Sequence, residues 1–141
     1  MRSYLIATHG KLASGFNDAI KMLIGEDEHV TTIDAYVNDE DTLVEDLQAW
    51  VDSIADADQA VIFTDLEIGS VNQKILTLIY DMPHVFLLTG ANLPVILDIM
   101  LIEDSLTEEI IQDSIRQARE SITISKLDGS AGNATDDEFL S

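Results

Sequence analysis

Cysteine is absent from the 141 residues of this chain. Its absence excludes disulfide frameworks, thiolate zinc sites and cysteine nucleophiles, and it is compatible with a reducing cytoplasm. No apolar stretch approaches the roughly 18–20 residues of a membrane-spanning helix. The apolar run at the N-terminus is too short for a secretion signal and no cleavage pattern follows it. We therefore expect a soluble, cytoplasmic protein.

Basic residues are scarce: seven Lys and Arg stand against 27 Asp and Glu, for a formal net charge of −20. A surface this acidic repels nucleic acid phosphates and anionic lipids, so we expect no nucleic acid partner. It favours protein partners that carry a basic patch. Solubility or a saline habitat would by itself suffice to explain the charge.

Several motifs of phosphate and metal chemistry are also missing. Gly10 and Gly15 form neither a GxGxxG loop nor a P-loop, and no G-x-S-x-G nucleophile elbow occurs. No three ligands fall at the spacing of a metal site. We therefore expect neither a metal nor a cofactor.

What the chain does contain is the composition of one globular domain, with 46% hydrophobic residues. Short apolar runs alternate with longer segments of helical spacing, which predicts an α/β fold: a doubly wound, open sheet of four parallel strands with helices on both faces. The second run mixes Thr31, Thr32 and Asp34 with apolar residues, which places it at an edge; we expect strand order 2-1-3-4. The four runs are Tyr4–Ala7, Val30–Ala35, Ala60–Phe63 and Val85–Leu88.

Helical periodicity predicts five helices, over Lys11–Ile24, Asp41–Ile54, Ser70–Tyr80, Leu93–Leu101 and Thr107–Ile122. Asn92 is a good N-cap, with Pro94 in the first turn. Asn38 or Asp41 could cap the second helix. The last helix has two possible capping boxes, Thr107 with Glu109 or Ser105 with Glu108.

The C-terminal region divides into two parts. Residues Ile122–Leu127 alternate like a short edge strand. Residues 128–141 are acidic and rich in small residues, which is typical of a flexible tail. We therefore expect a domain over residues 1–127 followed by an acidic tail.

Polar residues follow three of the predicted strands, and ligands of open parallel sheets bind beyond the carboxyl ends of strands. His9 and Asp65 would face each other across neighbouring strands 1 and 3. A carboxylate that accepts an imidazole N–H fixes the tautomer and stabilises the cation. Gly69 and Ser70 open one helix and Asn92 starts another, and helix N-termini bind phosphate. Together these features outline a phosphohistidine site.

Each of these features alone has an ordinary structural explanation. A histidine at a strand end is usually structural, an aspartate after a strand is commonly a turn or helix cap, and Glu67 is expected to be solvated. His29 and His84 fall at the amino edge of the sheet, where we expect them to face water or cap turns. The case for a site therefore depends on the convergence of the three loops.

Three segments give the chain a resemblance to a known family. They read YLIATHGKLASG (4–15), VIFTDLEIGSVNQ (61–73) and LLTGANLPVILDIM (87–100). In order and spacing they resemble the IIA component of the mannose-type (mannose/fructose/sorbose) sugar phosphotransferase system, over roughly residues 3–127.

The resemblance implies a phosphotransferase that acts as a phosphocarrier. By motif, His9 accepts the phosphoryl group from the phosphorylated histidine-containing phosphocarrier protein and passes it to a IIB component. Sugar import then proceeds through membrane components IIC and IID, which the chain would meet only indirectly. Asp65 falls on the family's orienting aspartate and Ser70 on its phosphate-loop serine, while Gly69 and Asn92 would offer amides. The family also implies a homodimer, in some members with an exchanged C-terminal strand.

The middle segment departs from the family pattern of Asp, two variable residues and Gly-Gly-Ser-Pro. Ile68 replaces the first glycine, Val71 replaces the proline, and Glu67 adds a negative charge. These changes are expected to alter how the backbone donors of the phosphate loop are arranged. They would also suit a related phosphoprotein that serves dihydroxyacetone kinase, although the segment GANLP favours the sugar transporter branch.

Other functions remain as alternatives. A regulatory phosphoprotein would share the His9 site but signal to a partner instead of feeding a transporter. A non-catalytic scaffold would dimerise through its last strand and not need His9. A receiver-like domain is disfavoured, since it needs an acidic pair after strand 1, where this chain has Thr8 and His9.

Overall fold

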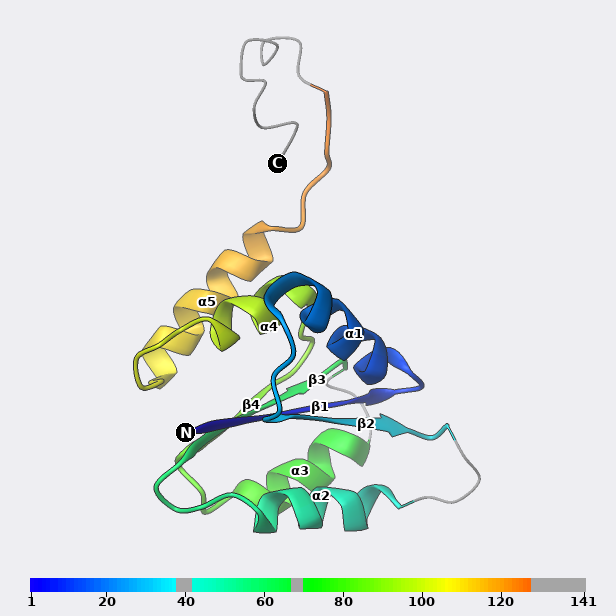
Figure 1. The fold of residues 1–141 in the computed structure, drawn as a ribbon, viewed down its shortest axis with the longest axis vertical. Helices are drawn as coiled ribbons and strands as arrows, with labels where there is room; N and C mark the ends of the chain where they lie inside the picture. Colours follow the sequence, from blue (N-terminus) through cyan, green and yellow to red (C-terminus); the bar gives the residue numbers. More distant parts are fainter. Residues whose placement is uncertain (38–41, 67–69, 128–141) are drawn as a thin grey trace.

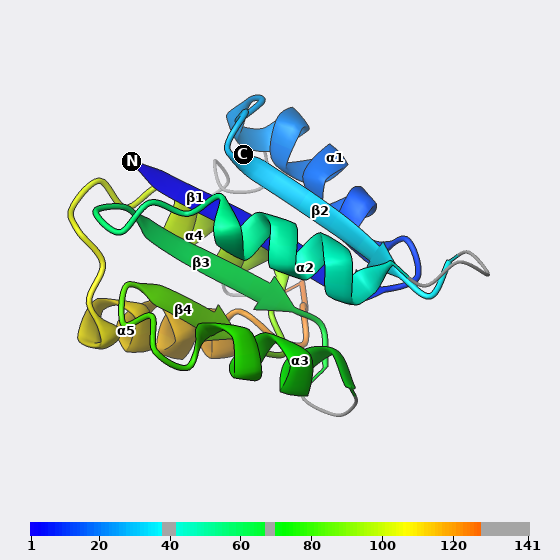
Figure 2. The same ribbon diagram turned by 90° about the horizontal axis from the view of Figure 1, so that it is seen from below.

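The sheet has four parallel strands in the order β2-β1-β3-β4, as expected. The computed structural model describes residues 1–37, 42–66 and 70–127. Figures 1 and 2 show β1 and β3 at the centre, with β2 and β4 at the two edges. The strands are β1 (Arg2–His9), β2 (Val30–Ala35), β3 (Gln59–Thr64) and β4 (Val85–Leu88).

Helices cover both faces of this sheet, which confirms the doubly wound α/β architecture. In Figure 1, α1, α4 and α5 lie on one face, and α2 and α3 lie on the other. The bounds agree with the expected helices to within two residues at each end: α1 (Leu12–Ile24), α2 (Leu43–Asp52), α3 (Ser70–Ile79), α4 (Leu93–Met100) and α5 (Glu108–Glu120). Within the described residues, no helix has both the length and the apolar character needed to cross a membrane.

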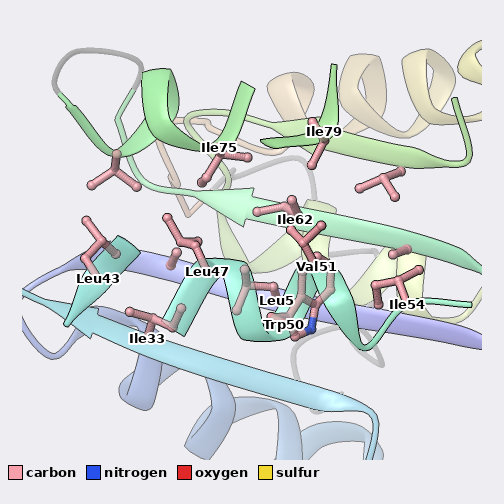
Figure 3. Packing of buried hydrophobic residues seen from close by; sticks show 14 of the residues in the cluster. Leu5, Ile33, Leu43, Leu47, Trp50, Val51, Ile54, Ile62, Ile75 and Ile79 are labelled. Carbon is pink, nitrogen blue, oxygen red and sulfur yellow. The ribbon is translucent and has the colours of Figure 1, made fainter. Parts of the chain in front are cut away.

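The central strands are buried on both faces, which is why they read as continuous apolar runs. Side chains alternate along β1, so that Leu5 belongs to the cluster with α2 and α3, and Ile6 to the cluster with α1, α4 and α5. Figure 3 shows the first cluster, where Leu47 of α2 and Ile75 of α3 lie over the strands. Two packed cores thus fix the strand ends that carry the candidate site.

The start of α1 is held by side chains from two strands. The hydroxyl of buried Thr8 accepts a hydrogen bond from the Ala13 amide at 2.7 Å. Asp34 of β2 accepts one from the Ser14 amide at 3.0 Å and a second from the Ser14 hydroxyl. These bonds satisfy amides that a helix leaves unpaired at its N-terminus. They also explain why an aspartate interrupts the apolar pattern of β2.

Two expected caps are confirmed. The Asn92 side chain accepts from the Val95 amide at 3.0 Å, and Thr107 accepts from the Ile110 amide at 3.1 Å. Thr107, and not Ser105, therefore caps the last helix. Thr42 occupies the N-cap position of α2, and the caps expected there, Asn38 and Asp41, lie outside the described residues.

The C-terminal edge strand expected over Ile122–Leu127 is not confirmed. These residues form neither helix nor strand and are exposed, and Figure 1 shows the segment running away from the sheet after α5. A strand needs a neighbouring strand to pair its backbone groups, and α5 leads this segment away from both sheet edges. The acidic tail expected over 128–141 lies outside the described residues.

Candidate functional site

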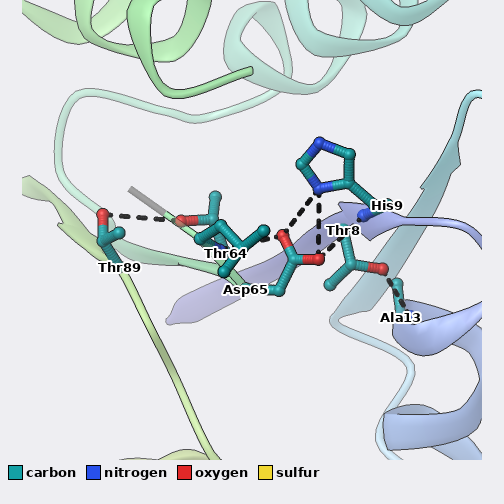
Figure 4. A network of polar contacts seen from close by, with 7 residues as sticks. Thr8, His9, Ala13, Thr64, Asp65 and Thr89 are labelled. Atoms are coloured by element: carbon teal, nitrogen blue, oxygen red, sulfur yellow. Dashed lines mark hydrogen bonds and ion pairs between the residues drawn. The ribbon is translucent and has the colours of Figure 1, made fainter. Parts of the chain in front are cut away.

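The structure brings His9 and Asp65 together, as the sequence predicted. His9 is the last residue of β1, and Asp65 directly follows β3. The two strands are parallel neighbours whose register pairs Ala7 with Thr64, so both side chains emerge at the carboxyl edge of the sheet. Figure 4 shows the carboxylate beneath the imidazole ring.

One carboxylate holds both the ring and the backbone of His9. Both oxygens of Asp65 lie 3.2 Å from Nδ1 of His9. Oδ2 also accepts from the His9 amide at 3.1 Å, and Oδ1 accepts from the Leu66 amide at 3.0 Å. Because a carboxylate only accepts hydrogen bonds, Nδ1 carries the proton in this arrangement. The lone pair of the neutral imidazole is then on Nε2, on the side of the ring away from Asp65 (Figure 4).

The imidazole is accessible and the carboxylate is largely covered. The His9 side chain is 42% exposed, and that of Asp65 is 14% exposed. Burial strengthens the hold of an anion on a neighbouring N–H, since fewer water molecules compete for it. The arrangement can therefore present a nucleophilic nitrogen at the surface and stabilise the positive charge that forms on the ring.

Beside Asp65, a polar network joins three chain segments (Figure 4). Buried Thr64 lies next to Asp65 and contacts the Thr89 hydroxyl at 3.5 Å. Asn72 of α3 donates to the same hydroxyl at 2.8 Å, and the Ala91 amide donates to the Thr64 carbonyl at 2.9 Å. The network links α3 and the loop after β4 to the end of β3. None of the sequence patterns described above predicts this network, although Asn72, a polar residue at a buried helical position, was a usable signal.

The structure describes only two of the three residues that were expected to bind phosphate. Gly69 lies outside the described residues, and Ser70 is the first residue of α3. Asn92 caps α4 with its own side chain, and no hydrogen bond joins it to His9 or Asp65 within the described residues. Their part in holding phosphate stays a prediction.

Tyr36 contacts His9, which the sequence patterns did not predict. Its ring lies against the His9 imidazole, with 5.6 Å between ring centroids and 36° between ring planes. Tyr36 follows β2, the strand on the other side of β1 from Asp65. Its position directly after a strand that pairs with β1 was the available signal.

The other two histidines lie elsewhere. The His29 amide donates to Asp27 at 2.8 Å, within the turn that precedes β2. His84 precedes β4; it was expected to face water or cap a turn, and its Nε2 is buried. Within the parts of the chain that are described, no three His, Asp or Glu side chains cluster as metal ligands.

Comparison with solved structures finds 13 chains with significant similarity. A putative phosphoenolpyruvate-dependent sugar phosphotransferase system (PTS) permease from Klebsiella pneumoniae is 32% identical, with a TM-score of 0.79 over 87% of this chain and 90% of that one. A PTS IIA protein associated with the fucose utilization operon of Streptococcus pneumoniae is 26% identical, with a TM-score of 0.76 over 87% and 92%. No match was found among curated proteins.

A third solved structure supports the fold alone. The mannose/sorbose-specific IIA subunit from Enterococcus faecalis is 17% identical, with a TM-score of 0.72 over 90% of this chain and 96% of that one. By sequence, the family model described as the PTS system fructose IIA component matches residues 3–116. Because that match covers most of the chain and includes both His9 and Asp65, this protein belongs to the mannose-type IIA family of the sugar phosphotransferase system.

Proposed function

We propose that this chain is a phosphocarrier that accepts a phosphoryl group on Nε2 of His9 and passes it on for sugar uptake. The donor is the phosphorylated histidine-containing phosphocarrier protein, and the acceptor is a IIB component. The observation that carries the proposal is the bond between Nδ1 of His9 and the Asp65 carboxylate. It leaves Nε2 as the nucleophile at an exposed strand end.

The reaction follows from this geometry. The Nε2 lone pair attacks phosphorus while the bond from phosphorus to the donor's nitrogen breaks. The proton on Nδ1 stays in its hydrogen bond, and the Asp65 carboxylate offsets the positive charge of the phosphorylated ring. Transfer to IIB reverses these steps with a new acceptor. Positioning and electrostatics account for most of the catalysis in phosphoryl transfer.

The amides expected to support the phosphoryl group belong to the N-termini of two helices. Ser70 begins α3, and Asn92 caps α4. Both helices follow strands of the same parallel sheet, so their N-termini lie toward the edge that carries His9. Backbone N–H groups at helix N-termini favour an anion. Gly69 completes the proposed set.

Exposed apolar side chains around His9 support a protein as the exchange partner. Leu12 begins α1 just after the His9 loop, Leu66 follows Asp65, and Tyr36 contacts the imidazole; all three are exposed. Apolar side chains grouped at a surface are typical of protein interaction sites. Docking on them would exclude water from the phosphoryl group during transfer.

A homodimer is the second part of the proposal. The exposed Ile122 and Ile124 alternate with polar residues, and β4 is an edge strand. A groove of about 540 Å³ follows β4; its lining is mostly apolar and includes Phe86 and Leu87, with Glu108 and Gln112 as polar members. Residues 122–127 of a second copy would pair with β4 and cover this groove, which protects an edge that otherwise invites aggregation.

Phosphate transfer is the direct test of the phosphocarrier role. Labelled phosphoenolpyruvate, enzyme I and the phosphocarrier protein are supplied to wild type, His9→Ala and the control His29→Ala. We expect acid-labile, base-stable label on wild type and His29→Ala, and none on His9→Ala. Absence of label on wild type, with the carriers active on a known acceptor, would overturn the proposal.

A chase then separates transport from regulation. Labelled protein is mixed with candidate IIB components in the absence of sugar, and the label on each protein is followed over time. Movement of label to a IIB component supports the transport role. Stable label in the presence of every such component would favour the regulatory alternative.

A further inference from the structure

Tyr36 has an unusual backbone conformation. Its φ of +62° lies in the left-handed region, and it is the only non-glycine residue with positive φ in the described part of the chain. This region is unfavourable for residues with bulky side chains. Such conformations persist where the surrounding structure holds them, and they cluster at functional sites. The outlier therefore calls for a functional explanation.

The turn at Tyr36 places its ring beside the imidazole. Ala35 ends β2 and pairs in register with His9, so Tyr36 is the first residue beyond this pair. The separation of 5.6 Å and the tilt of 36° lie within the range of interacting aromatic rings. Tyr36 is 50% exposed, so core packing does not account for an aromatic residue at this position.

His9 is thereby contacted from both neighbouring strands. Asp65 follows β3 and accepts a hydrogen bond from Nδ1 of His9. Tyr36 follows β2, and its aromatic ring contacts the imidazole ring. The carboxylate alone fixes one edge of an imidazole that is 42% exposed, and a ring held at one edge can still swing about its side-chain bonds. A second contact from the other strand restricts that swing.

On the basis of the phosphocarrier role proposed above, we propose that Tyr36 is a positioning residue for His9. Its aromatic ring keeps the imidazole in the orientation in which Nε2 faces an incoming phosphoryl donor. Reacting atoms must be held close and aligned for fast transfer. Removal of the Tyr36 ring should therefore slow phosphoryl loading by about three- to tenfold, the range expected for an aromatic pair.

Three variants separate the ring from the backbone. Tyr36→Phe keeps an aromatic ring. Tyr36→Asn removes it but retains a residue that tolerates the left-handed region. Met22→Asn is the control, because Met22 is an exposed apolar residue (86%) near the end of α1 and does not line the groove along β4. NMR of the unphosphorylated proteins would measure the His9 ring order from carbon relaxation and its tautomer from nitrogen shifts, with His9→Ala used for assignment. The rate of phosphoryl loading is measured in parallel.

We expect Tyr36→Phe and Met22→Asn to match wild type in both measurements. Tyr36→Asn should show a more mobile imidazole and slower loading, with an unchanged fold by circular dichroism. Wild-type ring order and rate in Tyr36→Asn would overturn the inference, as would an equal loss in Tyr36→Phe. If ring order falls in Tyr36→Asn while wild type takes up no phosphate, the restraint by Tyr36 is established and the phosphocarrier role is refuted.

Discussion

Asp65 accepts hydrogen bonds from the imidazole, from the His9 amide and from the Leu66 amide. The two backbone bonds fix the carboxylate in place before any partner arrives. In the proposed transfer, the carboxylate would therefore not need to reorganise when the ring gains positive charge. Such preorganisation makes electrostatic stabilisation effective in enzymes.

Asp65→Asn tests this function at the scale of one residue. The amide retains the shape but loses the charge that stabilises a cationic ring. Hydrogen bonds to charged groups contribute about 1.5–3 kcal/mol, so we expect phosphoryl loading of His9 to slow about ten- to a hundredfold. Rapid-quench measurement of labelled protein would give the rate, and thermal unfolding would show whether the fold is intact. An unchanged rate would mean that Asp65 does not stabilise the charged ring.

At the scale of elements, the site depends on how α1 begins. The residue before His9, Thr8, and the β2 residue Asp34 both bind amides in the first turn of α1. The end of β1, the end of β2 and the helix are thus joined directly beside the imidazole. The loop that follows His9 is short and held at both ends, which limits how far the histidine can move.

Thr8→Val tests the contribution of this junction. Valine has nearly the same shape, but the Ala13 amide would lose its acceptor in a buried position. We expect the free energy of unfolding to fall by about 1–2 kcal/mol, measured by urea titration. Thr31→Val is the control, because Thr31 is an exposed residue of the edge strand β2 and should change stability by less than about 0.5 kcal/mol. Equal effects of the two substitutions would contradict a capping function for Thr8.

At the scale of the whole molecule, β2 and β4 differ in what lies beside them. The groove along β4 is lined by side chains of α3 and α5 as well as of the strand itself. The groove along β2 includes polar Thr31, Thr32 and Asp34. The apolar residues of the segment 122–127 therefore match β4 better than β2, which is why the proposed dimer uses β4.

Two truncations test the dimer. A chain that ends at Leu127 retains the proposed strand, and a chain that ends at Ser121 lacks it. We expect full-length protein and the longer truncation to sediment as dimers, and the shorter one to shift toward monomer, because its β4 edge has no strand to pair with. The same mass for both truncations would show that residues 122–127 do not hold a dimer together.

The sequence by itself determined the alternation of strands and helices, the cap at Asn92 and the placement of His9 and Asp65 at the carboxyl edge. These features depend on local patterns of burial and on turn chemistry, which neighbouring residues encode. Only the tertiary structure reveals that Thr8 and Asp34 accept hydrogen bonds from the first turn of α1 and that the Tyr36 ring contacts the imidazole.

The physical reason is that two of these contacts, Asp34 with Ser14 and Tyr36 with His9, join residues of different elements. Those two contacts depend on the register between β1 and β2 and on one left-handed residue after β2. The Thr8 contact spans only five residues, but it depends on the path of the loop after His9, which no periodic pattern describes. The spacing of hydrophobic residues does not specify the φ angle of Tyr36, and tyrosine is not a residue type that favours positive φ. The expected strand over 122–127 is not confirmed for a related reason. Alternation describes how a segment could pair, whereas pairing needs a neighbouring strand, which this single chain does not place beside the segment.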